Sequence, residues 1–137
     1  MLKNKLVPMA VVAVSLLSAG LANAGARYAY SVTVDNTNHR AYGSAGTARN
    51  SADSNMLLAC SVQAGTSLSG VVSAPVATCS AVDAAGTYGS CSTSEATFVD
   101  AVKTSFTGDS YVLFGWNAAG TCNGITIYNG SYFEPKK

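Results

Sequence analysis

The sequence predicts a mainly β protein: a small antiparallel sheet or sandwich-like domain, with one packed helix over about residues 93–106 and two disulfides. An α+β arrangement is the alternative. Short runs of Val, Ile, Tyr, Thr and Phe alternate with small polar residues between turns rich in Gly, Asn and Asp, which is typical of strands. One stretch has helical spacing of its apolar residues. Four cysteines, an even number, indicate a disulfide framework if the chain is secreted.

The first 24 residues have the pattern of a secretory signal peptide. Lys3 and Lys5 precede an apolar run over 6–17, and small residues then lead to Ala22-Asn23-Ala24. The apolar stretch is shorter than the roughly 20 residues that a spanning helix needs, which argues against a membrane anchor. We therefore predict cleavage of segment 1–24, a single domain over 25–137, and a location in the periplasm or the extracellular medium.

The charge of the predicted mature domain excludes nucleic acid as a partner. Loss of Lys3 and Lys5 leaves six basic and seven acidic residues, so the net charge changes from +1 to −1. The basic residues form no cluster except Lys136-Lys137, whereas phosphate neutralisation needs several on one surface. No glycine-rich phosphate cradle follows a strand and opens a helix, so no nucleotide or other cofactor is expected. No membrane association is expected after cleavage.

Three segments in the first half of the domain are distinguished by their patterns. Residues 28–35 alternate as a half-buried strand, with Tyr28, Tyr30, Val32 and Val34 on one face. Segment 36–55 is rich in small polar residues and is predicted to be mostly loop, with at most a weak strand near 39–45. Segment 56–63 is predicted as a strand that places Met56, Leu58, Cys60 and Val62 on one side.

Two nearly identical pentapeptides predict two hairpins with the same turn. Asp83–Thr87 and Asn117–Thr121 differ only in the first residue, and Asp or Asn followed three residues later by Gly suits a three-residue hairpin loop. If Asp83 faces Thr87, Cys79 faces Cys91, within reach of a disulfide. We therefore predict the pairs Cys79–Cys91 and Cys60–Cys122. The cysteine spacing contains no Cys-x-x-Cys pair, which argues against a zinc site.

The second hairpin is predicted to have two apolar faces. If Asn117 faces Thr121, Trp116 faces Cys122 on the side of the main core. The opposite side then carries Tyr111, Leu113, Ile125 and Ile127, which form a candidate contact face unless the helix covers them.

The single predicted helix begins at a capping box. Ser92 is the predicted cap, and Glu95 is predicted to reach back to it. Phe98, Val99, Val102 and Phe106 follow at helical spacing, and Gly108 is the predicted stop. The apolar stripe predicts that this helix lies flat on a sheet.

Residues for catalysis or metal binding are few. His39 is the only histidine and lies in a polar segment; no nucleophile motif accompanies it, so it is interpreted as a solvated loop residue. Oxygen-bearing residues gather at 35–38 and 50–55 but lack the spacing of a calcium loop, so no metal site is predicted.

These observations favour a small secreted non-catalytic binding or interaction protein, with a protein or glycan as its partner outside the cytoplasm. The seven tyrosines and Trp116 support this hypothesis, because such rings suit sugar and protein surfaces. One alternative is an inhibitor of a secreted hydrolase that presents the 36–55 loop. Another is a small hydrolase using His39. The sequence leaves the ligand and the oligomeric state open.

Overall fold

The computed structural model describes residues 28–65 and 73–133, so the predicted signal peptide lies outside the described residues. In this part the protein is mainly β, with two antiparallel sheets and two helices, which confirms the predicted fold class. Neither helix in these ranges has the length and apolar character needed to cross a membrane.

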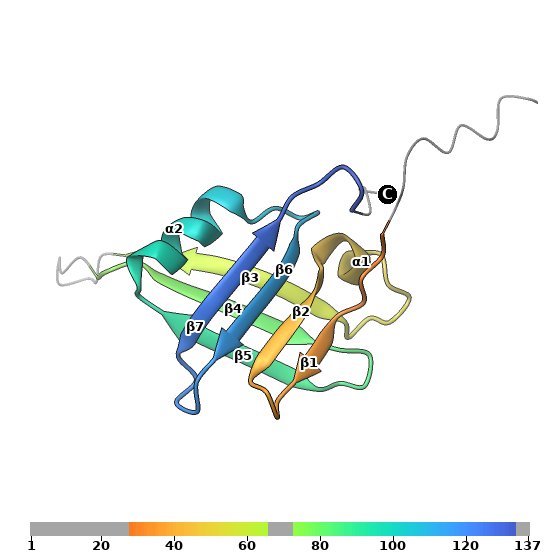
Figure 1. Cartoon of the computed structure of the whole chain (residues 1–137), viewed down its shortest axis with the longest axis horizontal. Coiled ribbons are helices and arrows are strands. Elements are labelled where there is room, and N and C mark those ends of the chain that lie inside the picture. The colour runs from red at the N-terminus through yellow and green to blue at the C-terminus, as the bar shows by residue number, and fades with distance from the viewer. Residues whose placement is uncertain (1–27, 66–72, 134–137) are drawn as a thin grey trace, which may run out of the picture.

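The two sheets stack to form a sandwich (Figure 1). One sheet has the order β1-β2-β6-β7, built from β1 (Thr33–Asp35), β2 (Arg40–Ser44), β6 (Tyr111–Trp116) and β7 (Cys122–Tyr128). The other has the order β3-β4-β5, built from β3 (Leu57–Gln63), β4 (Val76–Val82) and β5 (Tyr88–Thr93). Figure 1 shows the strands of the second sheet crossing behind those of the first.

The core lies between the sheets and combines large rings with very small side chains. Phe114 is fully buried, and Trp116 is 9% exposed. Ala41, Ala77 and Ala81 on facing strands are fully buried as well. The small residues leave room between the two layers for the large rings, as close packing of a protein interior requires.

Segment 36–55 is the largest error of the sequence prediction for secondary structure. The strand predicted near 39–45 is present as β2, but β2 is an inner strand of the four-stranded sheet, and α1 (Ala45–Arg49) was not predicted, so only part of the segment is loop. Its small residues serve close packing. A Cβ on Gly43 would lie 2.9 Å from Val32 Cα and 3.1 Å from Ser31 O, and Ala41 lies opposite Phe114. The same composition in the sequence resembles a loop.

The strand predicted over 28–35 is confirmed only in its second half. Val32 and Val34 are buried as expected, and the ladder with β2 covers Thr33–Asp35. Tyr28 and Tyr30 are instead about half exposed. The strand predicted over 56–63 is confirmed as β3, and Leu58 and Cys60 are buried.

The predicted helix is confirmed as α2 (Ala96–Ser105), with Phe98, Val99 and Val102 buried. The cap, however, is Glu95 rather than Ser92. The Glu95 carboxylate accepts a hydrogen bond from Phe98 N (2.9 Å), while Ser92 belongs to β5 and its hydroxyl pairs with that of Thr78. The helix packs on β3, β4 and β7, so it closes one side of the sandwich against both sheets (Figure 1).

Both predicted turns are confirmed and use the same hydrogen bonds. Asp83 Oδ1 accepts from Ala85 N (3.0 Å) and Thr87 N (2.9 Å). Asn117 Oδ1 accepts from Ala119 N and Thr121 N, both at 3.0 Å. The glycine of each turn has a positive φ, 79° at Gly86 and 74° at Gly120, so the left-handed position falls where the sequence places it.

The twin turns give a matched test of what the Asp83 side chain contributes. We expect Asp83→Ala to lower the free energy of unfolding by about 1 kcal/mol, because two backbone N–H groups lose their acceptor, as at a helix cap. Asp83→Asn should be nearly neutral, since Asn117 makes the same two bonds in the other turn. Urea unfolding at neutral pH measures both. If Asp83→Asn lowered the free energy of unfolding as much as Asp83→Ala, the amide would be unable to replace the carboxylate in this turn.

The same carboxylate predicts a loss of stability in acid. Desolvation raises the pKa of Asp83, but hydrogen bonds from Thr87, Ala85 and Val34 outweigh it, and the pKa lies below its ordinary value of 3.8. A depressed pKa in the folded state contributes stability that is present above the unfolded value and is lost as the pH falls through the folded value. Asp83→Asn should therefore weaken the dependence of stability on pH below about pH 4.

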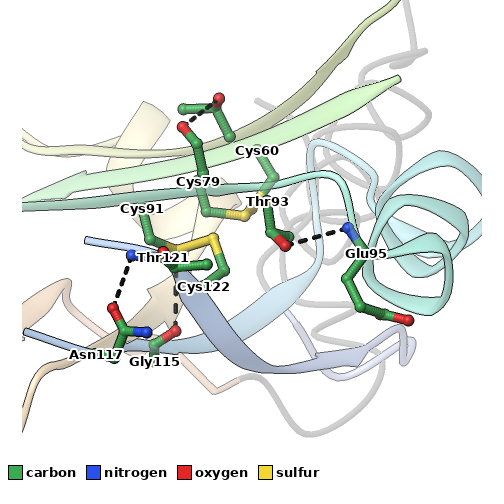
Figure 2. Close-up of a disulfide and its surroundings, with 11 residues drawn as sticks. Cys60, Cys79, Cys91, Thr93, Glu95, Gly115, Asn117, Thr121 and Cys122 are labelled. Atoms are coloured by element: carbon green, nitrogen blue, oxygen red, sulfur yellow. Dashed lines mark hydrogen bonds between the residues drawn. A yellow bond between two sulfur atoms is a disulfide. The ribbon is translucent and has the colours of Figure 1, made fainter. Parts of the chain in front are cut away.

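The predicted disulfide pairing is wrong, although the predicted register is right. Cys79 faces Cys91 across the β4–β5 hairpin, as expected, but it also faces Cys60 of β3 on its other side. The bonds are Cys60–Cys79 and Cys91–Cys122. Figure 2 shows the two bridges close together. Cys79 thus bonds within its own sheet, which leaves Cys91 to join β5 to β7 of the other sheet.

A bulge overturns the predicted register of the second hairpin. Trp116 faces Cys122 as expected, but the register shifts by one beyond it, so Phe114 faces Ile125 and Tyr111 faces Tyr128. The extra residue is Asn123, opposite which β6 has none. Because partners across a ladder share a face, a shift of one moves side chains to the other side of the sheet.

The candidate contact face of Tyr111, Leu113, Ile125 and Ile127 is therefore not one face. Ile125 and Ile127 lie on the same side as Phe114 and Val112 and pack against the core. Tyr111 and Leu113 lie on the outer side of the sheet, paired with Tyr128 and Thr126. The helix α2 packs against β3, β4 and β7, and the ladder partner of Tyr111 is Tyr128 instead of the expected Ile127.

Candidate functional site

An aromatic cluster forms where the four-stranded sheet meets both ends of the described chain. Tyr111 begins β6 and Tyr128 ends β7, and they are partners across the ladder. Tyr30 precedes β1, and Tyr132 and Phe133 follow β7. Figure 1 shows the segment after β7 turning toward the segment that leads into β1. Residues from the two ends of the chain thus meet beside Tyr111.

Backbone hydrogen bonds hold the two end segments together. Tyr28 and Phe133 form an isolated parallel bridge, and Tyr28 N donates to Tyr132 O at 2.8 Å. Ser44 N donates to Tyr30 O at 2.9 Å, which ties the first segment to the end of β2. Phe133 is 5% exposed and acts as the buried base of the cluster.

A hydrogen-bonded polar pair lies next to Tyr111 and Tyr128 in the sequence. Ser110, fully buried, precedes Tyr111, and Asn129 follows Tyr128. The Ser110 hydroxyl donates to Asn129 Oδ1 at 2.5 Å, and Asn129 Nδ2 donates to Ser105 O at 2.7 Å. These bonds connect the adjacent ends of β6 and β7, so the two tyrosine rings project from a rigid base.

The rings stand at different angles to one another. Tyr111 and Phe133 are nearly parallel, with 14° between their planes and centroids 5.9 Å apart. Tyr30 crosses both, at 73° to Tyr111 and 62° to Phe133. Tyr128 is tilted by 41° to Tyr111, and Tyr132 by 49° to Phe133. The cluster therefore has inclined walls and is not a flat platform.

Five of these residues line an open cavity of about 320 Å³, which we call the tyrosine cavity: Tyr30, Tyr111, Tyr128, Tyr132 and Phe133. Its volume is at the lower end of the range for small-molecule sites. Tyr30, Tyr128 and Tyr132 remain 42–55% exposed, so their rings are accessible to a ligand.

Within residues 28–65 and 73–133, the tyrosine cavity has no charged side chain in its lining. Burial raises the pKa of Tyr111 above its ordinary value of 10.0, and the neighbouring Tyr42, Tyr30 and Tyr128 raise it further. The Tyr111 phenol is therefore neutral at physiological pH. The side chains of the described lining residues are aromatic rings and phenol hydroxyls, which suit binding by apolar and π contacts.

His39 lies away from this cavity, in the turn between β1 and β2. Its φ of 49° is in the left-handed region, and its ring meets Trp116 edge-on with centroids 6.2 Å apart. Within residues 28–65 and 73–133, no hydrogen bond or ion pair joins the imidazole to a carboxylate. The nearby Asp35 instead bonds Asn38 and Arg40, and the bonds from Asn38, followed by the effect of Arg40, lower its pKa.

The segment considered as an inhibitory loop, 36–55, retains only short loops. The 36–39 turn joins β1 to β2, and residues after α1 lead into β3. Arg49, at the end of α1, donates to Gly108 O and pairs with Asp109 at 2.8 Å, which fastens this region to the loop before β6.

Of the five lining residues, the sequence placed Tyr111 on the candidate contact face and Tyr30 on the strand predicted over 28–35. Tyr128 and Tyr132 were counted only among the tyrosines, and Phe133 was not singled out. No relation of Tyr30, Tyr128 or Tyr132 to Tyr111 was predicted. The available signal was the concentration of rings at 28–30 and 128–133. That signal becomes a site only when the two ends meet, and no local motif marks this pairing.

Comparison with models of protein families, with curated proteins and with solved structures gave no match for this chain. Its function is therefore argued from the residues of the site.

Proposed function

We propose that this chain is a small secreted non-catalytic binding protein, and that the tyrosine cavity is its ligand site. The observation that carries the proposal is the convergence of five aromatic side chains from three separate segments around one open cavity, whose described lining residues carry no charge. Aromatic residues are enriched where proteins bind partners, because each ring offers a large contact area at low conformational cost.

The construction of the cavity supports a binding role. A surface that exposes several large rings is costly unless they contact something, and here they are held in place by Ser110, Asn129 and the Tyr28–Phe133 bridge. A preorganised site loses less entropy when a ligand binds. The disulfide between the sheets adds rigidity to the same scaffold.

Binding can be tested with a matched pair of tyrosine substitutions. Tyr111→Leu removes a central ring of the cavity, whereas Tyr88→Leu removes a ring on β5 that is 57% exposed and does not line the cavity. We expect Tyr111→Leu to weaken ligand binding about tenfold or more, as truncation of a central aromatic contact does, and Tyr88→Leu to leave it unchanged.

The readout is a two-dimensional amide NMR titration with four probes: choline, 3,3-dimethylbutan-1-ol, methyl glucoside and a hexaproline peptide. The proposal expects at least one probe to shift the resonances of Tyr30, Tyr111 and Tyr128 in a saturable way. Shifts confined to other surfaces, or no saturable shift with any probe, would overturn it. Cooperative thermal unfolding of both variants controls for loss of fold.

Secretion is tested separately by the N-terminus of the exported protein. We expect the chain expressed with its leader in a bacterial host to begin at Gly25 in the periplasm or medium, because the leader fits the cleavage pattern. N-terminal sequencing reads this directly. Recovery of the chain in the cytoplasm with residues 1–24 intact would contradict the assignment.

A further inference from the structure

We propose that the tyrosine cavity takes a quaternary ammonium group, such as the trimethylammonium end of choline. The inference rests on the proposed function, since it names the chemical class of ligand for the same cavity. It follows from the angles of the rings, from the polar groups that the lining provides, and from the size of the cavity.

The angles of the rings favour a compact, rounded group over a flat one. Tyr30 stands at 73° to Tyr111 and at 62° to Phe133, so these rings meet as the walls of a corner. A flat platform allows one face of a sugar ring to stack, whereas a corner contacts a rounded group on several sides. A trimethylammonium group is such a rounded group.

The polar content of the lining argues against ligands with many hydrogen bonds. None of the five lining residues has a carboxylate, amide, guanidinium or ammonium side chain, so phenol hydroxyls are the side-chain polar groups available. Hydroxyls of a sugar that face the ring walls would lack hydrogen-bond partners there, which costs binding energy. A primary ammonium has three N–H donors to satisfy, but a quaternary ammonium has none.

The electrostatics of the lining favour a cation of this kind. The face of an aromatic ring carries partial negative charge, and a cation over it is attracted by about 0.5–2 kcal/mol, depending on how far it is desolvated. Among the residues that the structure describes, the lining contains no lysine or arginine that would repel a cation or occupy the rings itself. The cavity of about 320 Å³ suits a small ligand of this class.

The test compares choline with 3,3-dimethylbutan-1-ol, which has the same shape but a neutral carbon in place of nitrogen. We expect choline to bind about 2- to 30-fold more tightly, as the cation–π energies imply. Tyr111→Phe keeps the ring and should retain choline binding, while Tyr111→Leu should reduce it about tenfold. Tyr88→Leu is the control and should have no effect.

Each contrary result has a distinct meaning. Equal binding of choline and the neutral alcohol, or binding of methyl glucoside or hexaproline in preference to choline, would overturn the inference and leave the proposed function intact. Failure of all four probes to bind the cavity would overturn both. Phosphatidylcholine vesicles form a further arm: vesicle binding that free choline competes away assigns the group to a lipid headgroup, and choline binding without vesicle binding assigns it to a soluble molecule.

Discussion

Replacing Phe114 by alanine is expected to lower the free energy of unfolding by about 3–5 kcal/mol, the usual cost of removing a buried phenyl ring. Phe114 is fully buried on β6 between Ala41 and Ile125 across the ladder, and its ring lies 5.7 Å from that of Trp116. Its neighbours are alanine, isoleucine and a fixed indole, so little can move in to fill the space. A small domain has a total stability of about 5–15 kcal/mol, so the loss is a large share of it.

Tyr88→Ala is the matched control for this prediction. Tyr88 is also an aromatic residue in a strand, but it is 57% exposed, and its truncation should change stability by less than about 0.5 kcal/mol. Chemical denaturation of both variants, with the disulfides kept oxidised, measures the difference. A loss of less than 1 kcal/mol in Phe114→Ala would mean that the core between the sheets is not packed as described.

Removal of the bridge between the sheets is the second large effect. The double substitution Cys91→Ala with Cys122→Ala should cost about 3–4 kcal/mol, because a bond that spans 31 residues strongly restricts the unfolded chain. The same bond joins β5 to β7, so its loss also loosens the contact between the two layers. Unfolding in urea under non-reducing conditions gives the value.

Peptide mapping without reduction checks the pairing on which this prediction depends. The fragments should contain Cys60 joined to Cys79 and Cys91 joined to Cys122. Fragments that join Cys79 to Cys91 would contradict this pairing. An unchanged urea midpoint in the double variant would show that the bridge contributes nothing to stability.

The disulfides illustrate which parts of the fold the sequence could predict. The turn at Asp83 is a local signal, so the register that places Cys79 opposite Cys91 was predicted correctly. The pairing of β3 with β4, which places Cys60 on the other side of Cys79, has no comparable turn motif in the sequence. Three cysteines thus lie in one row across the sheet, and local geometry alone cannot decide which two bond.

A single residue explains the failure of the predicted contact face. The turn at Asn117 was predicted correctly, but Asn123 is an extra residue that shifts the ladder by one. The shift puts Tyr128 opposite Tyr111 and sends Ile125 and Ile127 to the core. Alternation of residue types looks similar in either register, so the sequence contains little to reveal a bulge.

The tyrosine cavity could not be predicted from any local pattern in the sequence. Tyr28 and Phe133 are at opposite ends of the described chain, and their bridge depends on the path of every strand between them. The composition of each end indicated aromatic surface, which the structure gathers around Tyr111. Segment 36–55 was misinterpreted for a related reason. Its small residues pack closely in β2, but in the sequence they resemble loop residues.

The most direct test of the tyrosine cavity as the ligand site is a set of intermolecular NOEs, measured on protein with ¹³C-labelled tyrosine rings and saturated with the probe that binds best. We expect contacts from the probe to the rings of Tyr30, Tyr111 and Tyr128, and none to Tyr88. A saturated probe whose contacts fall on Tyr88 or on no tyrosine ring would contradict it.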